Sequence, residues 1–355
     1  MGLAASLLLA YLITALFMFA LRPIARAVNL VDVQRGHKRH SASVPVTGGI
    51  SMSLGLYFVL NLFDHPEFWD PVVLAAMLLV MVGTIDDRFD LPASVRLIAQ
   101  TCAAMLVIFG SGILVVDLGE AFFIPVNLGV FSLPFTLLFV VTIINAFNVV
   151  DGIDGLAGSL SLLCFLALAV VGVGSDVFSF SLVMAAIVSA FLLFNLPIGV
   201  NKAVRAFMGD AGSTFLGVIV AALGVAMCQG ESPQFSPVIG LWFVAVPVFD
   251  LFSAAIRRVM ERRSPFAPDH EHLHHVLITS GLSPKRTLLF MLAWGTAFVA
   301  VGLVGHAGQV ADSVMVVLWF AALVVYYQMM RRPKRVVAIL RQFDSVLMRA
   351  RLGRT

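Results

Sequence analysis

Three short motifs bring carboxylate and amide side chains to the ends of long apolar runs. The first carries Asp86, Asp87 and Asp90 and leads to Arg96. Adjacent carboxylates repel each other, so the Asp86–Asp87 pair is expected to share either a divalent cation or a proton. The alternative is a solvated loop in which an aspartate caps a helix that begins near Pro92.

The second motif places Asn145, Asn148, Asp151 and Asp154 at a spacing of three residues. On a helix or its frayed end, this spacing gathers the four side chains on one face. The glycines after Asp151 allow a broken turn whose backbone amides can approach an anion. An ordinary glycine-ended helix is the alternative, but it does not explain four oxygen-bearing side chains that leave an apolar run.

The third motif, Phe207–Gly217, opens another apolar run with Asp210. An aspartate at a helix N-terminus is stabilised by the helix dipole and is also a common N-cap. Asp210 alone therefore leaves a ligand role and a capping role open. A ligand role is favoured because the first two motifs lie at the same depth.

Basic side chains form two further groups. Four arginines and four histidines in the proline-stiffened loop 257–285 suit a phosphorylated, hydroxyl-rich substrate. A second group, in the loop 22–45, is a candidate for holding a lipid phosphate at the membrane interface. Basic loops also set membrane topology, which is the alternative for both groups. The first group holds Arg257, Arg258, Arg262, Arg263, His270, His272, His274 and His275, and the second holds Arg35, His37, Lys38, Arg39 and His40.

Residues 270–274 match the H-E-x-x-H pattern of zinc proteases. The match lies just after Pro265 and Pro268 in a charged loop, whereas an intramembrane protease would carry it on a helix within the membrane. It would also leave the acidic motifs without a purpose. An intramembrane zinc protease is therefore a remote alternative.

The elements that must position these motifs are transmembrane helices. Sixty per cent of the 355 residues are hydrophobic and 12% are charged, whereas about a quarter are charged in a typical soluble domain. We predict an all-α integral membrane protein with about eleven transmembrane helices, since apolar runs near 20 residues can each cross the bilayer. Residues 1–355 form a single polytopic domain. The predicted spans are residues 2–21, 46–63, 70–84, 95–112, 134–149, 156–174, 178–196, 211–228, 237–256, 286–304 and 313–330.

The distribution of basic residues predicts the orientation of the chain. No basic residue precedes the first span, and Arg22 and Arg26 follow it, which is the reverse of a secretory signal peptide. All 23 Lys and Arg lie within, or at the edge of, the loops on the side of Arg22. We therefore predict a periplasmic N-terminus and a cytoplasmic C-terminus with a basic tail at 331–355. The cytoplasmic loops are 22–45, 85–96, 197–210, 257–285 and 331–355.

Other features limit the classes of function. The net charge of +3 is explained by topology, so binding to nucleic acid is not indicated. A carrier for a charged lipid is an alternative, but carriers place polar groups near the bilayer midplane, where these spans have almost none. On the opposite side, residues 124–130 alternate apolar and other side chains, which predicts a short hairpin.

Together, in this order and topology, the motifs resemble those of the polyprenyl-phosphate N-acetylhexosamine-1-phosphate transferases. The resemblance covers essentially the whole chain and rests on Asn145–Gly158, Phe207–Gly217 and Ser264–His275. The last segment is similar to the N-acetylglucosamine-type branch. The resemblance implies Mg²⁺-dependent (alternatively Mn²⁺-dependent) transfer of N-acetylglucosamine-1-phosphate from its UDP derivative to undecaprenyl phosphate, with UMP released. The product would start O-antigen or another cell-envelope polysaccharide.

The resemblance also implies a location and partners. The enzyme is expected in the bacterial inner (plasma) membrane, among membrane lipid, with its active site on the cytoplasmic face, and a homodimer is suggested. Another UDP-N-acetylated sugar or UDP-MurNAc-pentapeptide is the alternative donor. Direct attack by the lipid phosphate and a covalent phospho-aspartate both remain open.

Each candidate residue receives an implied role from the same resemblance. Asp210 and Asn148 resemble the Mg²⁺ ligands of the family in their positions within the motifs. Asp86, Asp87 and Asp90 resemble its catalytic carboxylates in the same way. The residues implied in substrate binding are Lys38, Arg39, Arg96, Asn145, Asp151, Asp154, Arg258, His272, His274 and His275.

Overall fold

The apolar runs of the chain form helices, because inside a membrane each backbone polar group must be satisfied within its own segment. The computed structural model describes residues 2–32, 43–62, 65–197, 204–230, 232–265, 271–340 and 342. The helices are α1 (Leu3–Ala27), α2 (Gly48–Leu62), α3 (Asp70–Phe89), α4 (Ala93–Ser111), α5 (Ser132–Val150), α6 (Leu156–Val171), α7 (Asp176–Asn195), α8 (Gly209–Cys228), α9 (Pro237–Phe243), α10 (Ala245–Met260), α11 (Leu273–Thr279), α12 (Pro284–Ala307) and α13 (Asp312–Arg331). Two antiparallel pairs of strands complete the fold, β1 (Val31–Asp32) with β2 (Val44–Pro45) and β3 (Asp117–Ala121) with β4 (Ile124–Asn127).

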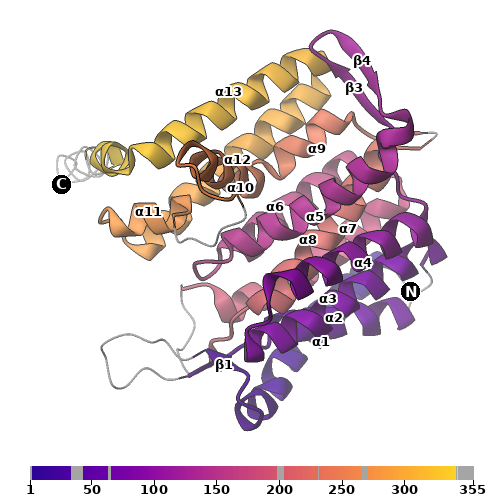
Figure 1. Cartoon of the computed structure of the whole chain (residues 1–355). Helices are drawn as coiled ribbons and strands as arrows, with labels where there is room; N and C mark the ends of the chain where they lie inside the picture. Colours follow the sequence, from indigo (N-terminus) through magenta and orange to yellow (C-terminus); the bar gives the residue numbers. More distant parts are fainter. Residues whose placement is uncertain are drawn as a thin grey trace, which may run out of the picture.

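Within the described ranges, eight helices are long and apolar enough to cross a membrane, namely α1, α3, α4, α5, α7, α8, α12 and α13. α9 and α10 together pass the same test, and α2 and α6 are apolar but shorter. The mostly helical integral membrane class is thus confirmed. The number of crossings and the sidedness of the termini stay predictions, although α1 and α13 run in the same direction, as an odd number of crossings requires (Figure 1).

The span predicted at residues 237–256 is not one straight helix. It consists of α9 and α10, which meet at Val244 with a bend of 84°. Pro247 explains the break, because proline has no N–H to donate and its ring clashes with the carbonyl four residues earlier. That carbonyl belongs to Phe243, the last residue of α9.

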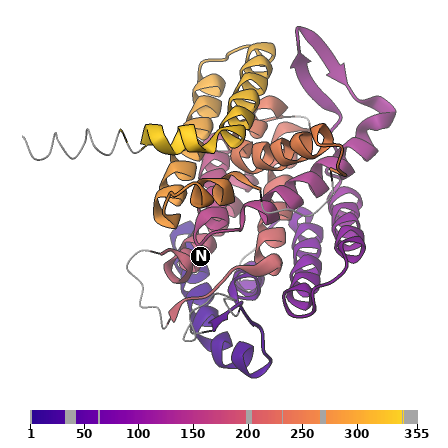
Figure 2. The same cartoon turned by 60° about the vertical axis from the view of Figure 1, so that its left-hand side comes forward.

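α8 lies at the centre of the bundle, packed between α3 and α5 (Figure 2). Small residues allow this close approach, since nothing larger fits between the backbones. A Cβ at Gly83 of α3 would overlap the backbone of Ala211, and a Cβ at Gly217 would overlap that of Ile144. The ends of α3, α5 and α8 are therefore held together.

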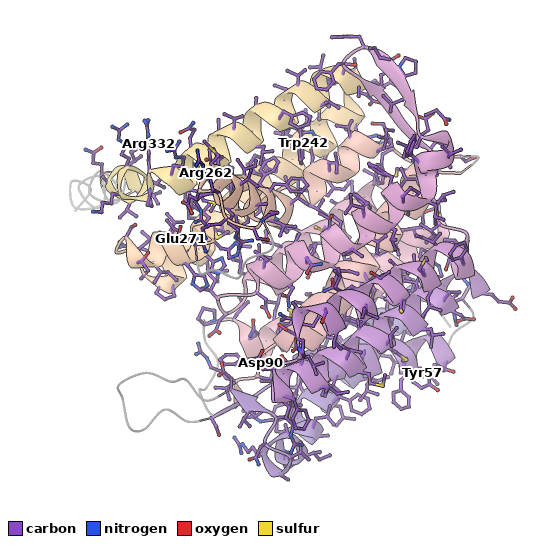
Figure 3. All side chains as sticks on the ribbon, in the orientation of Figure 1. Tyr57, Asp90, Trp242, Arg262, Glu271 and Arg332 are labelled. Carbon is purple, nitrogen blue, oxygen red and sulfur yellow. The ribbon has the colours of Figure 1, made fainter. Side chains whose placement is uncertain are left out.

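The predicted short hairpin is present as β3–β4, although residues 124–127 of the stretch 124–130 are strand and Gly129–Phe131 form a 3-10 helix. The hairpin lies beside α13 at one end of the bundle (Figure 1). The backbone N–H of Phe123 donates to Ser313 Oγ at 2.5 Å. Charged residues from separate elements, Asp90, Arg262, Glu271 and Arg332, lie toward the opposite end (Figure 3). The polar motifs thus gather away from the hairpin.

Candidate active site

The end of α3 meets the start of α8 through the carboxylate of Asp87. Its Oδ1 accepts a hydrogen bond from the backbone N–H of Asp210 at 2.8 Å, and its Oδ2 accepts one from Ala211 at 3.4 Å. Gly209 precedes them at φ +70°, and a Cβ there would overlap Asp87 Oδ2. Asp87 therefore caps α8 from a neighbouring helix, where the helix dipole favours negative charge.

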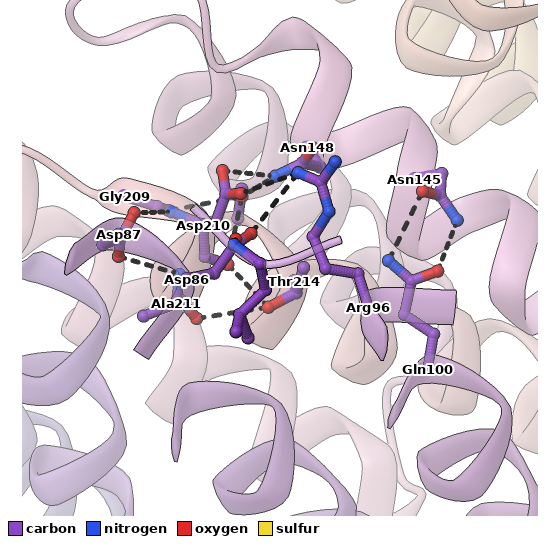
Figure 4. A network of polar contacts seen from close by, with 12 residues as sticks. Asp86, Asp87, Arg96, Gln100, Asn145, Asn148, Gly209, Asp210, Ala211 and Thr214 are labelled. Carbon is purple, nitrogen blue, oxygen red and sulfur yellow. Dashed lines mark hydrogen bonds and ion pairs between the residues drawn. The ribbon is translucent and has the colours of Figure 1, made fainter. Parts of the chain in front are cut away.

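The carboxylate of Asp86, the preceding residue, contacts Arg96 and the backbone of Leu91 (Figure 4). Its Oδ1 accepts from the backbone N–H of Leu91 at 2.6 Å, and its Oδ2 lies 3.3 Å from Arg96 Nη1. The same Arg96 nitrogen lies 3.5 Å from Asp210 Oδ2. Arg96 thus holds two carboxylates from α3 and α8 around one positive charge.

Asn148 joins this network from the end of α5. Its Nδ2 donates to Asp210 Oδ1 at 2.8 Å and to Ser213 Oγ at 3.0 Å. Asn145, one helical turn earlier, instead exchanges hydrogen bonds with Gln100 of α4, at 2.7 and 3.4 Å (Figure 4). The structure therefore brings Asn148 together with the acidic residues and directs Asn145 to a different helix.

A polar cavity of about 840 Å³ opens beside the network. It is lined by residues from the ends of α3, α5, α7 and α8, from the loop between α5 and α6, and from the segment between α1 and α2. A cavity of this size fits a ligand such as a nucleotide sugar. The lining residues are Asn29, Val31, Asp32, Val46, Asp87, Arg88, Asn148, Asp151, Gly152, Ile153, Asp154, Asn195, Phe207, Met208, Gly209 and Asp210.

Two acidic residues of the loop between α5 and α6 face this cavity. Burial raises the pKa of Asp151 well above its usual range, and the nearby carboxylates of Asp210 and Asp87 raise it further. Burial also raises the pKa of Asp154, although Arg205, at 3.3 Å, opposes the shift. This loop can therefore hold a proton or accept hydrogen bonds from a bound hydroxyl-rich ligand.

Three residues at the cavity or next to it were not predicted as site residues from the sequence. Arg205 was counted only as a topology-setting charge, although it pairs with Asp154. Asn195 accepts from the backbone N–H of Gly155 at 2.7 Å and donates to Ala206 O at 3.0 Å. Phe207 adds an aromatic residue to the lining. The available signal for Asn195 was a polar amide at the end of a long apolar run, which is costly unless it is paired.

The predicted histidine and arginine group lies at α10 and α11. Arg258 Nη1 donates to the backbone carbonyl of Pro265 at 2.7 Å, so it holds the loop that follows α10. His272 is buried beside Asp250, and His274 is fully buried. The ring of His275 lies 4.1 Å from that of His274, between centroids.

The structure does not place three other predicted site residues, Asp90, Lys38 and Arg39, in the acidic network. Asp90 is exposed and ends α3 at φ 53°, with its backbone N–H bonded to Asp86 O. Lys38 and Arg39 lie outside the described residues. Their predicted role with the lipid phosphate stays a prediction.

The zinc-protease alternative needs Glu271 as a general base next to metal-bound histidines. In the structure, Glu271 forms an ion pair with Arg257, and His272 pairs with Asp250. His270 lies outside the described residues. The ion pair with Arg257 thus engages the glutamate that a protease would use as its base.

The acidic network offers side chains of the kind that bind Mg²⁺. Carboxylate and amide oxygens are the ligands that Mg²⁺ prefers, and Mg²⁺ sites commonly use one or two carboxylates together with substrate phosphates. Among the described residues, no group of three or more His, Cys, Asp or Glu is arranged to hold a metal ion. Asp86 and Asp210, which already converge on the cationic Arg96, fit the open, substrate-completed kind of site.

Comparison with known proteins decides the family. Residues 69–228, which run from α3 to α8, match the family model described as glycosyl transferase family 4. An undecaprenyl-phosphate α-N-acetylglucosaminyl 1-phosphate transferase of Escherichia coli O157:H7 is 32% identical over 97% of this chain and 95% of its own. The protein of the same name from Haemophilus influenzae is 30% identical over 90% and 92%.

The chain belongs to glycosyl transferase family 4. The region matched to the family model carries all five residues of the acidic network, Asp86, Asp87, Arg96, Asn148 and Asp210. The histidines around the start of α11, His272, His274 and His275, lie outside that region but inside the similarity to the full-length relatives. As a member of family 4, the protein is an enzyme.

Proposed function

We propose that this protein transfers N-acetylglucosamine-1-phosphate from UDP-N-acetylglucosamine to undecaprenyl phosphate and releases UMP. The observation that carries the proposal is the convergence of Asp86 and Asp210 on Arg96 at the edge of a polar cavity. The names and near-complete coverage of the relatives support the same reaction.

The cavity suits the nucleotide part of the donor. Phe207 offers a face on which a nucleobase can stack, and base–aromatic stacking is worth about 1–3 kcal/mol. Asp151 and Asp154 can accept hydrogen bonds from hydroxyl groups. The diphosphate would then lie toward Asn148 and Asp210, where the cavity meets the acidic network.

Phosphoryl transfer requires mainly positioning and neutralisation of charge. In our account an oxygen of the lipid phosphate attacks the β-phosphorus of the donor. The bond from that phosphorus to the oxygen bridging the α-phosphate breaks, and UMP leaves with the electron pair. Arg96 is the cation in the network that can contact a phosphate directly, while Asp87 keeps the start of α8 in place. Mg²⁺ held by Asp210, with Asn148 or Asp86, would neutralise the charge of the donor diphosphate.

The location follows from the acceptor and the topology. The lipid phosphate lies at a membrane surface, and the basic loops predict that the network faces the cytoplasm. We therefore place the reaction at the cytoplasmic face of the bacterial inner membrane. There it would supply the first lipid-linked sugar of O-antigen or a related cell-envelope polysaccharide.

The test uses the purified full-length chain in detergent with undecaprenyl phosphate and a panel of UDP-sugars. Lipid-dependent release of UMP from UDP-N-acetylglucosamine is the expected result. Release of UDP would indicate transfer of the sugar without its phosphate and would overturn the proposal. If UMP is released only from a different UDP-sugar, the type of reaction is supported but the donor is that other sugar.

A further inference from the structure

A buried carboxylate lies at the base of the histidine segment, His272–His275, away from the acidic network. Asp250 of α10 has 0% of its surface exposed. Its Oδ1 accepts from the backbone N–H of Leu273 at 2.8 Å and from the hydroxyl of Tyr326 at 3.1 Å. Its Oδ2 lies 3.2 Å from His272 Nδ1. A charged group in the interior is retained only with such partners.

These contacts join three separate elements. Asp250 comes from α10, Leu273 begins α11, and Tyr326 lies on α13, where it too is buried. A carboxylate beside Nδ1 fixes both the orientation and the tautomer of an imidazole ring. Asp250 therefore holds the ring of His272 and the backbone of its neighbour at the same time.

The histidine segment is in turn packed against the acidic loop of the cavity. His274 is fully buried, and a Cβ at Gly152 would overlap its Nε2. Gly152 lies between Asp151 and Asp154, and all three line the cavity. The ring of His274 is parallel to that of His272 within 9°, with centroids 6.1 Å apart. A shift of the segment at Asp250 would therefore be transmitted to the wall of the cavity.

From this chain of contacts we infer that Asp250 is a positioning residue of the enzyme. It acts through His272, and Tyr326 supports it from α13. Its task is to hold the histidine segment against the loop that carries Asp151 and Asp154. The test by activity rests on the proposed function, whereas the test by stability depends on the geometry alone.

The first experiment is a double-mutant cycle on turnover with Asp250→Asn, His272→Gln and the double variant. Asparagine keeps an oxygen for Leu273 and Tyr326 but loses the charge beside His272. We expect Asp250→Asn to lower kcat about 100-fold, since small misplacements of catalytic groups have effects of that order. The KM for undecaprenyl phosphate should change little. If Asp250 acts through His272, the double variant is no worse than His272→Gln alone, because interacting residues are not additive.

Tyrosines 326 and 327 give a matched pair of controls. Tyr326→Phe removes a donor to Asp250, and we expect kcat to fall about tenfold, the effect of losing one hydrogen bond to a charged group. Tyr327 carries the same side chain one residue later, but its hydroxyl contacts Met260 Sδ. Tyr327→Phe should leave kcat unchanged.

The unfolding temperatures of the same three variants and the wild type are also measured in detergent. This second double-mutant cycle requires no substrate. Coupling between Asp250 and His272 supports the inference whichever donor the enzyme uses. Additive effects in both cycles, or wild-type kcat in Asp250→Asn, would overturn it. An inactive wild-type enzyme with a coupled unfolding cycle would count against the proposed function and not against the link between Asp250 and His272.

Discussion

The carboxylate of Asp87 accepts a 2.8 Å hydrogen bond from the backbone N–H of Asp210. The two residues come from different helices, α3 and α8, and are far apart in the sequence. This bond sets where α8 begins and so where the side chain of Asp210 lies. The preceding residue, Asp86, has a different partner, because its carboxylate contacts Arg96.

Asp87 should therefore tolerate a substitution that keeps an acceptor oxygen. Asp87→Ala removes both acceptors, and we expect it to lower turnover about 100-fold by displacing α8 and to lower stability by about 1 kcal/mol, as loss of an N-cap does. Asp87→Asn should retain more activity and stability than Asp87→Ala. Turnover and thermal unfolding of both variants check this. Equal loss of turnover with unchanged stability would indicate that Asp87 acts by its charge.

Asp86, in α3, and Asp90, just after its last residue, provide a matched comparison. Asp86 is 6% exposed and contacts Arg96 and the backbone of Leu91, whereas Asp90 is exposed at φ 53°, a conformation that asparagine also adopts. Asp86→Asn should lower kcat on the order of 10²-fold, as loss of a preorganised charge does. Asp90→Asn should stay within about a factor of two. A large loss in Asp90→Asn would support the catalytic role that the family resemblance implies for Asp90.

The pair Arg205–Asp154 predicts a shift in the pH profile. Arg205 lowers the pKa of Asp154 against the raising effect of burial. Arg205→Gln should therefore raise that pKa, and the acidic limb of the kcat/KM profile should move to higher pH. The profile is measured between about pH 5 and 9. Arg332→Gln, a change of the same kind at the end of α13, serves as the control and should leave the limb in place.

His274 predicts how stability depends on pH. Burial lowers its pKa from 6.5 to about 4, with His275 and His272 adding to the shift and Asp250 opposing it. The unfolded chain binds the proton first, so stability present above pH 6.5 is lost progressively as the pH falls toward 4. Unfolding temperatures at several pH values should fall less steeply in His274→Gln. An identical slope in the variant would contradict the buried neutral state of His274.

The sequence was sufficient for the membrane-spanning class because hydrophobicity alone determines which segments can enter a bilayer. It was not sufficient for the break at Val244, since α9 and α10 are both apolar enough to be read as one span. Pro247 was present in the sequence, but proline is tolerated in many membrane helices. The bend is what places α10, and with it Asp250, beside α13.

The sequence predicted which residues form the site better than it predicted which of them contact each other. The acidic motifs were expected to form one site, and Asp86, Asp87, Asn148 and Asp210 do lie together. Spacing could not tell that Asn145 would pair with Gln100, because residues three apart share a face but can meet different neighbouring helices. The ion pair of Arg205 with Asp154 depends on tertiary packing, which a local motif does not encode.

Mass spectrometry of the lipid product tests the central claim most directly. Wild-type enzyme, undecaprenyl phosphate and UDP-N-acetylglucosamine are mixed with Mg²⁺ or with EDTA, and the same is done with Asp210→Asn. We predict a lipid diphosphate carrying one N-acetylglucosamine, formed in equal amount to UMP, only in the wild-type sample with Mg²⁺. Product formation that withstands both EDTA and Asp210→Asn would contradict the assignment of the acidic network as the metal-dependent centre.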